Sequence, residues 1–332
     1  MPSTRANVTA TVGGNSFFAG KNKIINGDFQ IWQRGTSFSL TTGNSTYGAD
    51  RMVAQCTFSA GSSTYSQQSF TAGTAPVTGY EAQYFARLAT GSTTTQANFQ
   101  QRIEDVRTFA GQTVTVSVWA KSSTTSTLQF QFEQNFGSGG SSGVVTSATA
   151  QNLSSSWTRY TATVTLPSIS GKTIGTSNYL HLYLTFAGTI SSANFDVWGI
   201  QVEAGSVATP FETATGTLQG ELAACQRYYQ NLTPAVKAIG IGTFYSATAM
   251  NCYVYLPVEM RTTPTLSATS GTNYYGIYIS SGDSFNSFTI NSDATKRLVV
   301  MYNNSEVSGT AGQSGEVYVN DANGSVGASA EL

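Results

Sequence analysis

The sequence predicts an all-β protein that consists of a jelly-roll β-sandwich, a short linking helix and a smaller C-terminal β-sandwich. Three observations lead to this prediction. Apolar residues recur at every second position in many segments, clusters of Gly, Ser and Thr separate these segments, and one stretch alone has a helical period. The chain has 332 residues, more than the roughly 250–300 at which a single hydrophobic core stops growing, so two domains are expected.

The larger domain is predicted to span residues 21–212 as a two-sheet jelly roll. One of its strands, 113–121, alternates cleanly and predicts a half-buried antiparallel strand. It turns Val114, Val116 and Val118 to one face and Thr113, Thr115 and Ser117 to the other. Further strands are predicted at 24–32, 47–55, 63–70, 84–90, 97–104, 158–166 and 194–203.

Two other strands of this domain have polar faces that bear on function. Because successive side chains of a strand point to opposite faces, the alternation assigns each residue to one side. The strand at 127–133 turns Leu128, Phe130 and Phe132 inward and Gln129, Gln131 and Glu133 outward. The strand at 179–186 turns Leu180, Leu182, Leu184 and Phe186 inward and Tyr179, His181, Tyr183 and Thr185 outward.

The rest of the chain is divided into three parts. Residues 1–20 are small and polar and are interpreted as an N-terminal arm that packs on a neighbouring subunit. Residues 213–232 form a helical linker, in which a helix is predicted at 216–231. Its apolar stripe consists of Leu218, Leu222, Cys225 and Tyr229. Residues 233–332 form the C-terminal β-sandwich, with strands expected at 250–258, 274–279, 285–290, 297–302 and 315–319.

The composition excludes several classes of partner. The net charge is −1 and charged residues make up 10% of the chain, so no basic stripe is present for a nucleic acid. No apolar run of about 18 residues occurs, and the first residues lack the apolar core of a signal peptide, so neither membrane insertion nor general secretion is expected. Cys56, Cys225 and Cys252 are odd in number and far apart, and we interpret them as small buried residues.

Four stretches, in order along the chain, resemble a family of phage tail and virion proteins. They are KIINGDFQIWQRGTSF at 23–38 with YGADRM at 47–52, FDVWGIQVEAGSVATPFE at 195–212, ELAACQRYYQ at 221–230, and VEMRTTPTL at 258–266 with the terminal SAEL. Two positions depart from the family pattern: Met52 stands where Trp is usual, and Ser329 stands where Asp is usual. These departures affect details at single positions and not the expected architecture. The four stretches together extend from residue 23 to residue 332.

The resemblance implies a carbohydrate-binding-module-like jelly roll in a tail fibre or another host-recognition protein of the virion. We therefore expect a structural and adhesive protein without enzymatic activity, which recognises a host cell-surface glycan and contacts other virion proteins. A homo-oligomer is expected, with a trimer favoured by analogy with tail fibres. A head-attached fibre or decoration protein is the alternative within this class, and a capsule-degrading glycosidase is the alternative outside it.

The polar strand faces are the candidate glycan site, because aromatic rings stack on sugars while amides and carboxylates hydrogen-bond to hydroxyls. The candidates are Gln129, Gln131, Glu133, Tyr179, His181 and Tyr183. The alternative is that they form a solvated sheet face without a ligand. For the opening motif, an internal network in which Arg34 or Arg51 pairs with Asp50 is preferred to a binding site.

Groups for catalysis are scarce. The single histidine, His181, has no accompanying nucleophile elbow, which argues against a Ser/His/Asp hydrolase. A glycosidase needs two carboxylates, for which Glu104/Asp105 and Asp196/Glu203 are the available pairs. The resemblance further suggests a structural calcium ion, with Asp28 and Asp196 as its ligands.

Overall fold

The computed structural model describes residues 20–233 and 238–332, and it confirms the predicted all-β fold class with one short helix, α1 (Leu218–Gln226). The chain divides into two compact units. Of the described residues, the first unit contains those up to Gln30 and Gly35–Glu221, and the second contains Ile31–Arg34 and those from Leu222 to Leu332. The predicted arm at 1–20 lies outside the described residues except for its last residue. No helix in the described parts is long and apolar enough to span a membrane.

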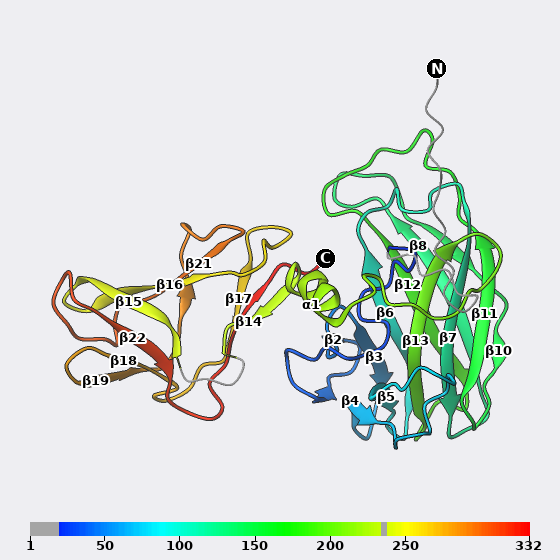
Figure 1. The fold of residues 1–332 in the computed structure, drawn as a ribbon, viewed down its shortest axis with the longest axis horizontal. Helices are drawn as coiled ribbons and strands as arrows, with labels where there is room; N and C mark the ends of the chain where they lie inside the picture. Colours follow the sequence, from blue (N-terminus) through cyan, green and yellow to red (C-terminus); the bar gives the residue numbers. More distant parts are fainter. Residues whose placement is uncertain (1–19, 234–237) are drawn as a thin grey trace. The chain divides into compact units, whose positions relative to one another are not determined.

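The first unit contains two antiparallel sheets (Figure 1). The order of the first sheet is β1 (Ser37–Leu40), β4 (Ser63–Ser69), β5 (Tyr84–Ala89), β13 (Asn194–Ala204), β7 (Thr113–Ser122) and β11 (Thr158–Thr165). The order of the second sheet is β10 (Gln151–Asn152), β8 (Ser126–Asn135), β12 (Tyr179–Gly188), β6 (Thr94–Ile103), β3 (Val53–Phe58) and β2 (Ser45–Tyr47), and β9 (Val144–Ser147) also pairs with β8.

The core of the first unit lies between these two sheets. Phe186 of β12 stacks on Phe195 of β13 with ring centroids 4.1 Å apart, which brings the two sheets face to face. The inward residues predicted for β8 are fully buried: Leu128, Phe130 and Phe132. Exposure alternates along the whole of β8, so the period-two pattern of the sequence defines both faces of this strand.

The strand predicted at 113–121 is confirmed as the antiparallel β7, but its polar face is buried at Thr115 and Ser117 and not half-buried as predicted. Thr115 and Ser117 are almost inaccessible. The Thr115 hydroxyl donates to the carbonyl of Gly205 (2.8 Å), and the Ser117 hydroxyl accepts from Arg159 (3.1 Å). β7 lies between β13 and β11 in the sheet, and the chain after β13 covers its polar face. Because water is excluded there, the hydroxyl groups of Thr115 and Ser117 hydrogen-bond to the protein.

The strand predicted at 24–32 is absent, because this segment forms turns. Asn26 and Phe29 both have φ of 58°, a left-handed conformation that ends a strand. The backbone N–H of Ile25 donates to the side chain of Gln101 (2.8 Å) in place of a neighbouring strand. Gly27 approaches β13 so closely that a Cβ atom would lie 2.2 Å from the carbonyl oxygen of Ile200, so only glycine fits there.

The helix is shorter than the predicted range of 216–231. Thr217 caps its start, where the Thr217 hydroxyl accepts from the N–H of Gly220 (3.1 Å). Leu218 and Leu222 are 60% and 37% exposed, so the predicted apolar stripe is wrong for these two residues. Cys225 is buried as predicted, whereas Tyr229 is buried in β14 and not in the helix.

The second unit is a smaller β-structure with its own core. Its three-stranded sheet contains β14 (Tyr229–Asn231), β23 (Val326–Ser329) and β17 (Thr265–Ala268). Its seven-stranded sheet contains, in order, β19 (Gly282–Phe285), β18 (Tyr275–Tyr278), β22 (Ser314–Val319), β15 (Ala238–Ser246), β16 (Ala249–Tyr255), β21 (Leu298–Asn303) and β20 (Thr289–Ile290). The core includes Met250, Cys252, Tyr275, Phe285 and Val317. All three cysteines of the chain are free and buried, as predicted.

Residues Ile31–Arg34 of the opening motif belong to this second unit. The guanidinium of Arg34 pairs with Glu331 at 2.9 Å and lies 3.6 Å from the ring centroid of Tyr229. Gln33 donates to the carbonyl of Tyr229 (2.9 Å) and accepts, through its own carbonyl, from Asn231 (3.0 Å). The motif is thus part of an internal network, as expected, in which Arg34 pairs with Glu331.

Candidate functional site

The strand register places all six predicted glycan-binding residues on one face of the second sheet. β8 and β12 are neighbours, with Tyr183 opposite Gln131 and His181 opposite Glu133. β6 extends the same rows on the other side of β12, since Tyr183 is also opposite Gln100. We call this side of the sheet the polar face; it consists of Gln55, Asn98, Gln100, Arg102, Gln129, Gln131, Glu133, Tyr179, His181, Tyr183 and Thr185. Asn98, Gln100 and His181 are buried, so its accessible amides lie mainly on β8.

Several groups on the polar face are already hydrogen-bonded to the protein. The Tyr183 hydroxyl donates to Glu133 (3.0 Å), and Gln129 donates to the carbonyl of Ala148 (3.0 Å). Gln100 donates to Gln55 at 3.1 Å. By contrast, the half-buried amide of Gln131 makes no side-chain hydrogen bond within the described residues, so both its donor and its acceptor can bind a ligand.

The histidine of the polar face is buried and not exposed as predicted. The ring of His181 is 3% exposed. The ring of Tyr183 lies 3.9 Å from it and that of Tyr179 lies 5.5 Å away, centroid to centroid. Burial, together with the positive charge of Arg102, lowers the pKa of His181 to about 3. The imidazole is therefore neutral at physiological pH and is covered by the tyrosines that a ligand would contact.

The two tyrosines form the aromatic part of the polar face. The guanidinium of Arg102 lies 4.8 Å from the ring centroid of Tyr179, a cation–π distance. Burial, and next the nearby charge of Glu133, raise the pKa of Tyr183. Its hydroxyl thus stays protonated and donates to Glu133. The face can offer amides, a carboxylate, a guanidinium and partly exposed rings to a hydroxyl-rich ligand.

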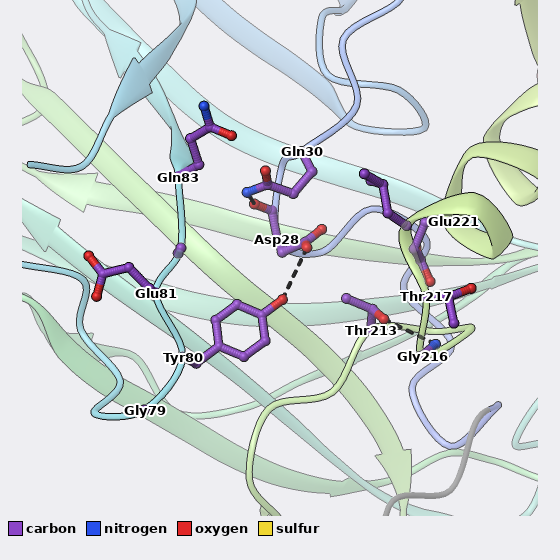
Figure 2. A pocket seen from close by; sticks show the side chains of 12 residues that line it. Asp28, Gln30, Gly79, Tyr80, Glu81, Gln83, Thr213, Gly216, Thr217 and Glu221 are labelled. Carbon is purple, nitrogen blue, oxygen red and sulfur yellow. Dashed lines mark hydrogen bonds between the residues drawn. The ribbon is translucent and has the colours of Figure 1, made fainter. Parts of the chain in front are cut away.

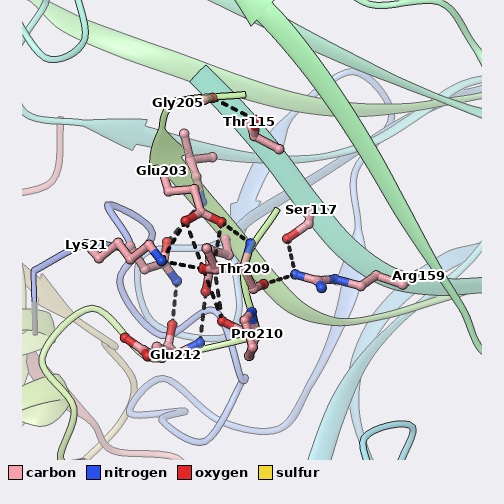
Figure 3. Close-up of polar contacts among 12 residues, drawn as sticks. Lys21, Thr115, Ser117, Arg159, Glu203, Gly205, Thr209, Pro210 and Glu212 are labelled. Atoms are coloured by element: carbon pink, nitrogen blue, oxygen red, sulfur yellow. Dashed lines mark hydrogen bonds and ion pairs between the residues drawn. The ribbon is translucent and has the colours of Figure 1, made fainter. Parts of the chain in front are cut away.

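One of the two carboxylate pairs considered for a glycosidase, Asp196 and Glu203, is bound by cations. Asp196 accepts two hydrogen bonds from Arg87 (2.6 and 2.8 Å), and Lys121 lies at 3.4 Å. Glu203 pairs with Lys21 at 3.0 Å (Figure 3). Both carboxylates of this pair are thus held in ion pairs within the first unit.

Glu203 is the centre of a dense polar cluster, which we call the Glu203 cluster. It accepts from the N–H of Thr209 (2.9 Å), from the hydroxyl of Thr209 (2.8 Å) and from Gln201 (2.8 Å). Burial alone would raise the pKa of Glu203, but these hydrogen bonds and that of Lys21 outweigh it and lower the pKa. Figure 3 shows these donors converging on the carboxylate of Glu203. Such a set of hydrogen bonds stabilises the fold around Glu203.

The predicted calcium ligands do not act together. Asp196 is held by Arg87 and Lys121, whereas Asp28 accepts from the Tyr80 hydroxyl at 3.3 Å (Figure 2). Calcium requires about six to eight oxygen ligands. No group of three or more acidic, histidine or cysteine side chains that could hold a metal ion is found among the described residues. The residues present therefore do not fit the expected calcium site.

Comparison with known proteins gives only remote similarities. No protein-family model matches the chain, and no curated protein matches it. Among solved structures, the enzymatically active domain of tailspike protein 4 from bacteriophage CBA120 is 16% identical, with a TM-score of 0.35; the match covers 56% of this chain and 22% of that one.

Two carbohydrate-binding structures are also similar. The CBM22-1 xylan-binding domain from Paenibacillus barcinonensis Xyn10C is 14% identical over 57% of this chain and 98% of that one, with a TM-score of 0.33. The N-terminal cellulose-binding domain of Cellulomonas fimi β-1,4-glucanase C is 15% identical over 39% of this chain and 84% of that one, with a TM-score of 0.30. Similarities at this level carry no functional assignment.

Proposed function

We propose that the first unit binds a glycan on its polar face and that the protein is adhesive and not enzymatic. The observation that carries this proposal is the register of β12 with β8 and β6, which aligns amides, tyrosines and Glu133 in adjacent rows. Hydroxyl groups of a sugar can donate to and accept from such amides, while a partly exposed ring supplies stacking area.

We further propose that the protein is a component of a phage virion. This role is supported by the four motifs that resemble tail and virion proteins, and by the network in which three of these motifs meet through Arg34, Tyr229 and Glu331. Host cell-surface glycan is then the expected ligand, and other virion proteins are the expected partners. The binding of Asp196 and Glu203 by cations supports adhesion over glycosidase activity.

The proposal is tested by binding of the full chain to a panel of bacterial surface polysaccharides. Gln131→Ala should lower the affinity for the polysaccharide that binds by about tenfold, because it removes a donor and an acceptor from the centre of the polar face. Gln112→Ala is the matched control, since Gln112 is an exposed amide outside this face. Equal binding by the Gln131 variant and the wild type would exclude the polar face, and release of oligosaccharide would exclude a purely adhesive role.

Self-association is also part of the proposal, and exposed tyrosines of the second unit are the side chains that support it. Tyr275 is fully buried in the core of the second unit and cannot contribute. Tyr278, Tyr253 and Tyr255 are 56%, 40% and 80% exposed, and Tyr253 lies beside the exposed Ile241 in the sheet. Light scattering of the full chain should give a multiple of the 35.1 kDa monomer mass, with three as the expected multiple.

A further inference from the structure

The first unit contains a pocket of about 470 Å³ that the proposed glycan function does not use (Figure 2). Three separate stretches of the chain form its walls: the turn after Gly27, the loop at 79–83, and the segment that leads into α1. Its lining residues are Asp28, Gln30, Gly79, Tyr80, Glu81, Ala82, Gln83, Thr213, Gly216, Thr217, Leu218 and Glu221. Three of these are carboxylates, and none is a lysine or an arginine.

One of the carboxylates has a buried oxygen atom without a partner. Asp28 is 5% exposed, and its Oδ1 accepts no hydrogen bond, while its Oδ2 accepts from Tyr80. Figure 2 shows Asp28 reaching into the space between Tyr80 and the segment that carries Thr213 and Glu221. A buried charged oxygen without a donor is unfavourable, so this atom is an acceptor that the folded chain itself leaves unused.

The second buried carboxylate, Glu221, is satisfied by neutral donors only. Its Oε2 accepts from the N–H of Asn26 (2.7 Å), and its Oε1 accepts from the N–H and the hydroxyl of Thr215 (2.7 and 2.9 Å). Glu221 is 2% exposed. No lysine or arginine in the described chain pairs with Asp28 or Glu221, in contrast to Asp196 and Glu203. Burial, and next the charge of Glu221, raise the pKa of Asp28 to about 6.

We propose that this pocket binds the protonated primary amine of a small polyhydroxylated molecule, namely an unacetylated amino sugar. The charge of an ammonium group complements the two buried carboxylates, and one of its three N–H donors can satisfy Oδ1 of Asp28. A divalent metal fits less well, because both oxygens of Glu221 already accept backbone N–H groups.

The lining favours a sugar over an aliphatic amine such as a lysine side chain. Apart from Tyr80, the apolar side chains of the pocket are Ala82 and Leu218, which offer little surface to a chain of methylene groups. Gln30, Gln83 and the threonine hydroxyls provide donors and acceptors for sugar hydroxyls. The volume lies within the range of about 300–1,000 Å³ that small-molecule sites usually have.

Calorimetric titration of the full chain with glucosamine at pH 7 tests this proposal. Glucosamine should bind, and N-acetylglucosamine, which lacks the charge, should bind at least about tenfold more weakly. Asp28→Asn should reduce glucosamine affinity by a similar factor. Asp293→Asn removes an exposed carboxylate of the second unit and should have no effect, and Gln131→Ala should also have none, which separates this pocket from the polar face.

A pH series on the wild type gives a test that needs no variant. Glucosamine affinity should fall as the pH drops from 7 to 5, because Asp28 gains a proton; Tyr80 stays neutral, and Glu81 and Glu221 are the other titratable groups of the pocket. The amine can only gain charge in this direction, so the loss reports the carboxylate. The proposal is overturned if glucosamine does not bind at millimolar concentration, if the acetylated sugar binds equally well, or if calcium chloride or N-α-acetyl-lysine amide binds more tightly.

Discussion

The Glu203 cluster and the pocket around Asp28, which we call the Asp28 pocket, both contain buried carboxylates in the jelly roll. The two carboxylates differ in how many hydrogen-bond donors surround them. Glu203 is surrounded by Lys21, Thr209 and Gln201, so that both of its oxygens have donors (Figure 3). Asp28 accepts from Tyr80 through Oδ2, whereas its buried Oδ1 has no partner at hydrogen-bond geometry (Figure 2). The pKa values follow this difference, since that of Glu203 is lowered and that of Asp28 is raised to about 6.

The comparison distinguishes a carboxylate whose hydrogen bonds stabilise the fold from one whose buried oxygen atom has no partner. A buried charge with a full set of donors is stabilised in its ionised form, and its removal leaves donors unpaired. A buried charge without them is tolerated at a cost that a ligand can offset. The comparison therefore predicts opposite effects of mutation in the two regions.

The largest effect is expected in the Glu203 cluster. Lys21→Met should lower the free energy of unfolding by about 2–3 kcal/mol, because Glu203 is 1% exposed and loses its cation. Denaturant unfolding measures this change. Lys23→Met is the matched control, since the side chain of Lys23 is exposed and its ammonium group donates to the carbonyl of Gly20. It should change stability by less than about 0.5 kcal/mol. Similar values for both variants would mean that the ion pair is not structural.

A substitution in the Asp28 pocket should change the free energy of unfolding in the opposite direction. Asp28→Asn should raise the free energy of unfolding by about 1–2 kcal/mol at pH 7.5, because it removes a buried charge that lacks a cation. The side chain keeps an acceptor for Tyr80. Thermal unfolding measures the change, and a lower melting temperature would contradict the view that this carboxylate is unfavourable in the fold.

The pH dependence of stability gives the same comparison a sign. With a pKa of about 6 in the folded chain and 3.8 as the ordinary value, Asp28 holds a proton between these pH values that the unfolded chain has lost. The free energy of unfolding therefore falls as the pH rises through this window, by up to about 3 kcal/mol from this group. The difference between the wild type and Asp28→Asn, measured from pH 4 to pH 7, should show this slope; a flat difference would contradict it.

A smaller effect is expected on the polar face. Tyr183→Phe removes the hydrogen bond to Glu133 and should lower stability by about 1 kcal/mol. The ring remains over His181, so the aromatic surface is kept. Glycan affinity should fall only severalfold, whereas Tyr183→Ala, which also removes the ring, should have the larger effect. Equal binding by all three proteins would place recognition elsewhere.

The smallest effect is expected from a change in α1, and it tests whether the raised pKa of Asp28 depends on the packing of this helix. Leu222→Ala should lower stability by less than about 1 kcal/mol, because Leu222 is 37% exposed and little apolar surface is lost. Glucosamine binding and the pH slope should stay unchanged. A large loss of stability or of binding would show that the helix supports the pocket through this residue.

The faces of individual strands could be predicted from the sequence, but their partners could not. The alternation in 127–133 and 179–186 separated apolar from polar residues correctly, because the period of a strand is local information. The adjacency of β8 and β12 depends on strand order. The burial of His181 was missed because Tyr179 and Tyr183, two positions away on either side, cover its ring.

The Asp28 pocket could not be predicted, because its partners are remote in sequence. Tyr80 lies 52 residues further along the chain, and Glu221 comes from the first helical segment after the jelly roll. One local signal was available: the pair Asn26-Gly27 is typical of a turn and argued against a strand at 24–32.

The membership of Ile31–Arg34 in the second unit has a consequence for how segments of this chain can be exchanged with those of a second protein. A single exchange point anywhere between residues 35 and 221 would transfer the distal strands together with Glu331 and Tyr229, but would leave Gln33 and Arg34 behind. A functional chimera then needs a compatible four-residue segment upstream, or a second exchange to supply it. Cutting and joining at the helix alone should therefore succeed only between parents that share this short segment.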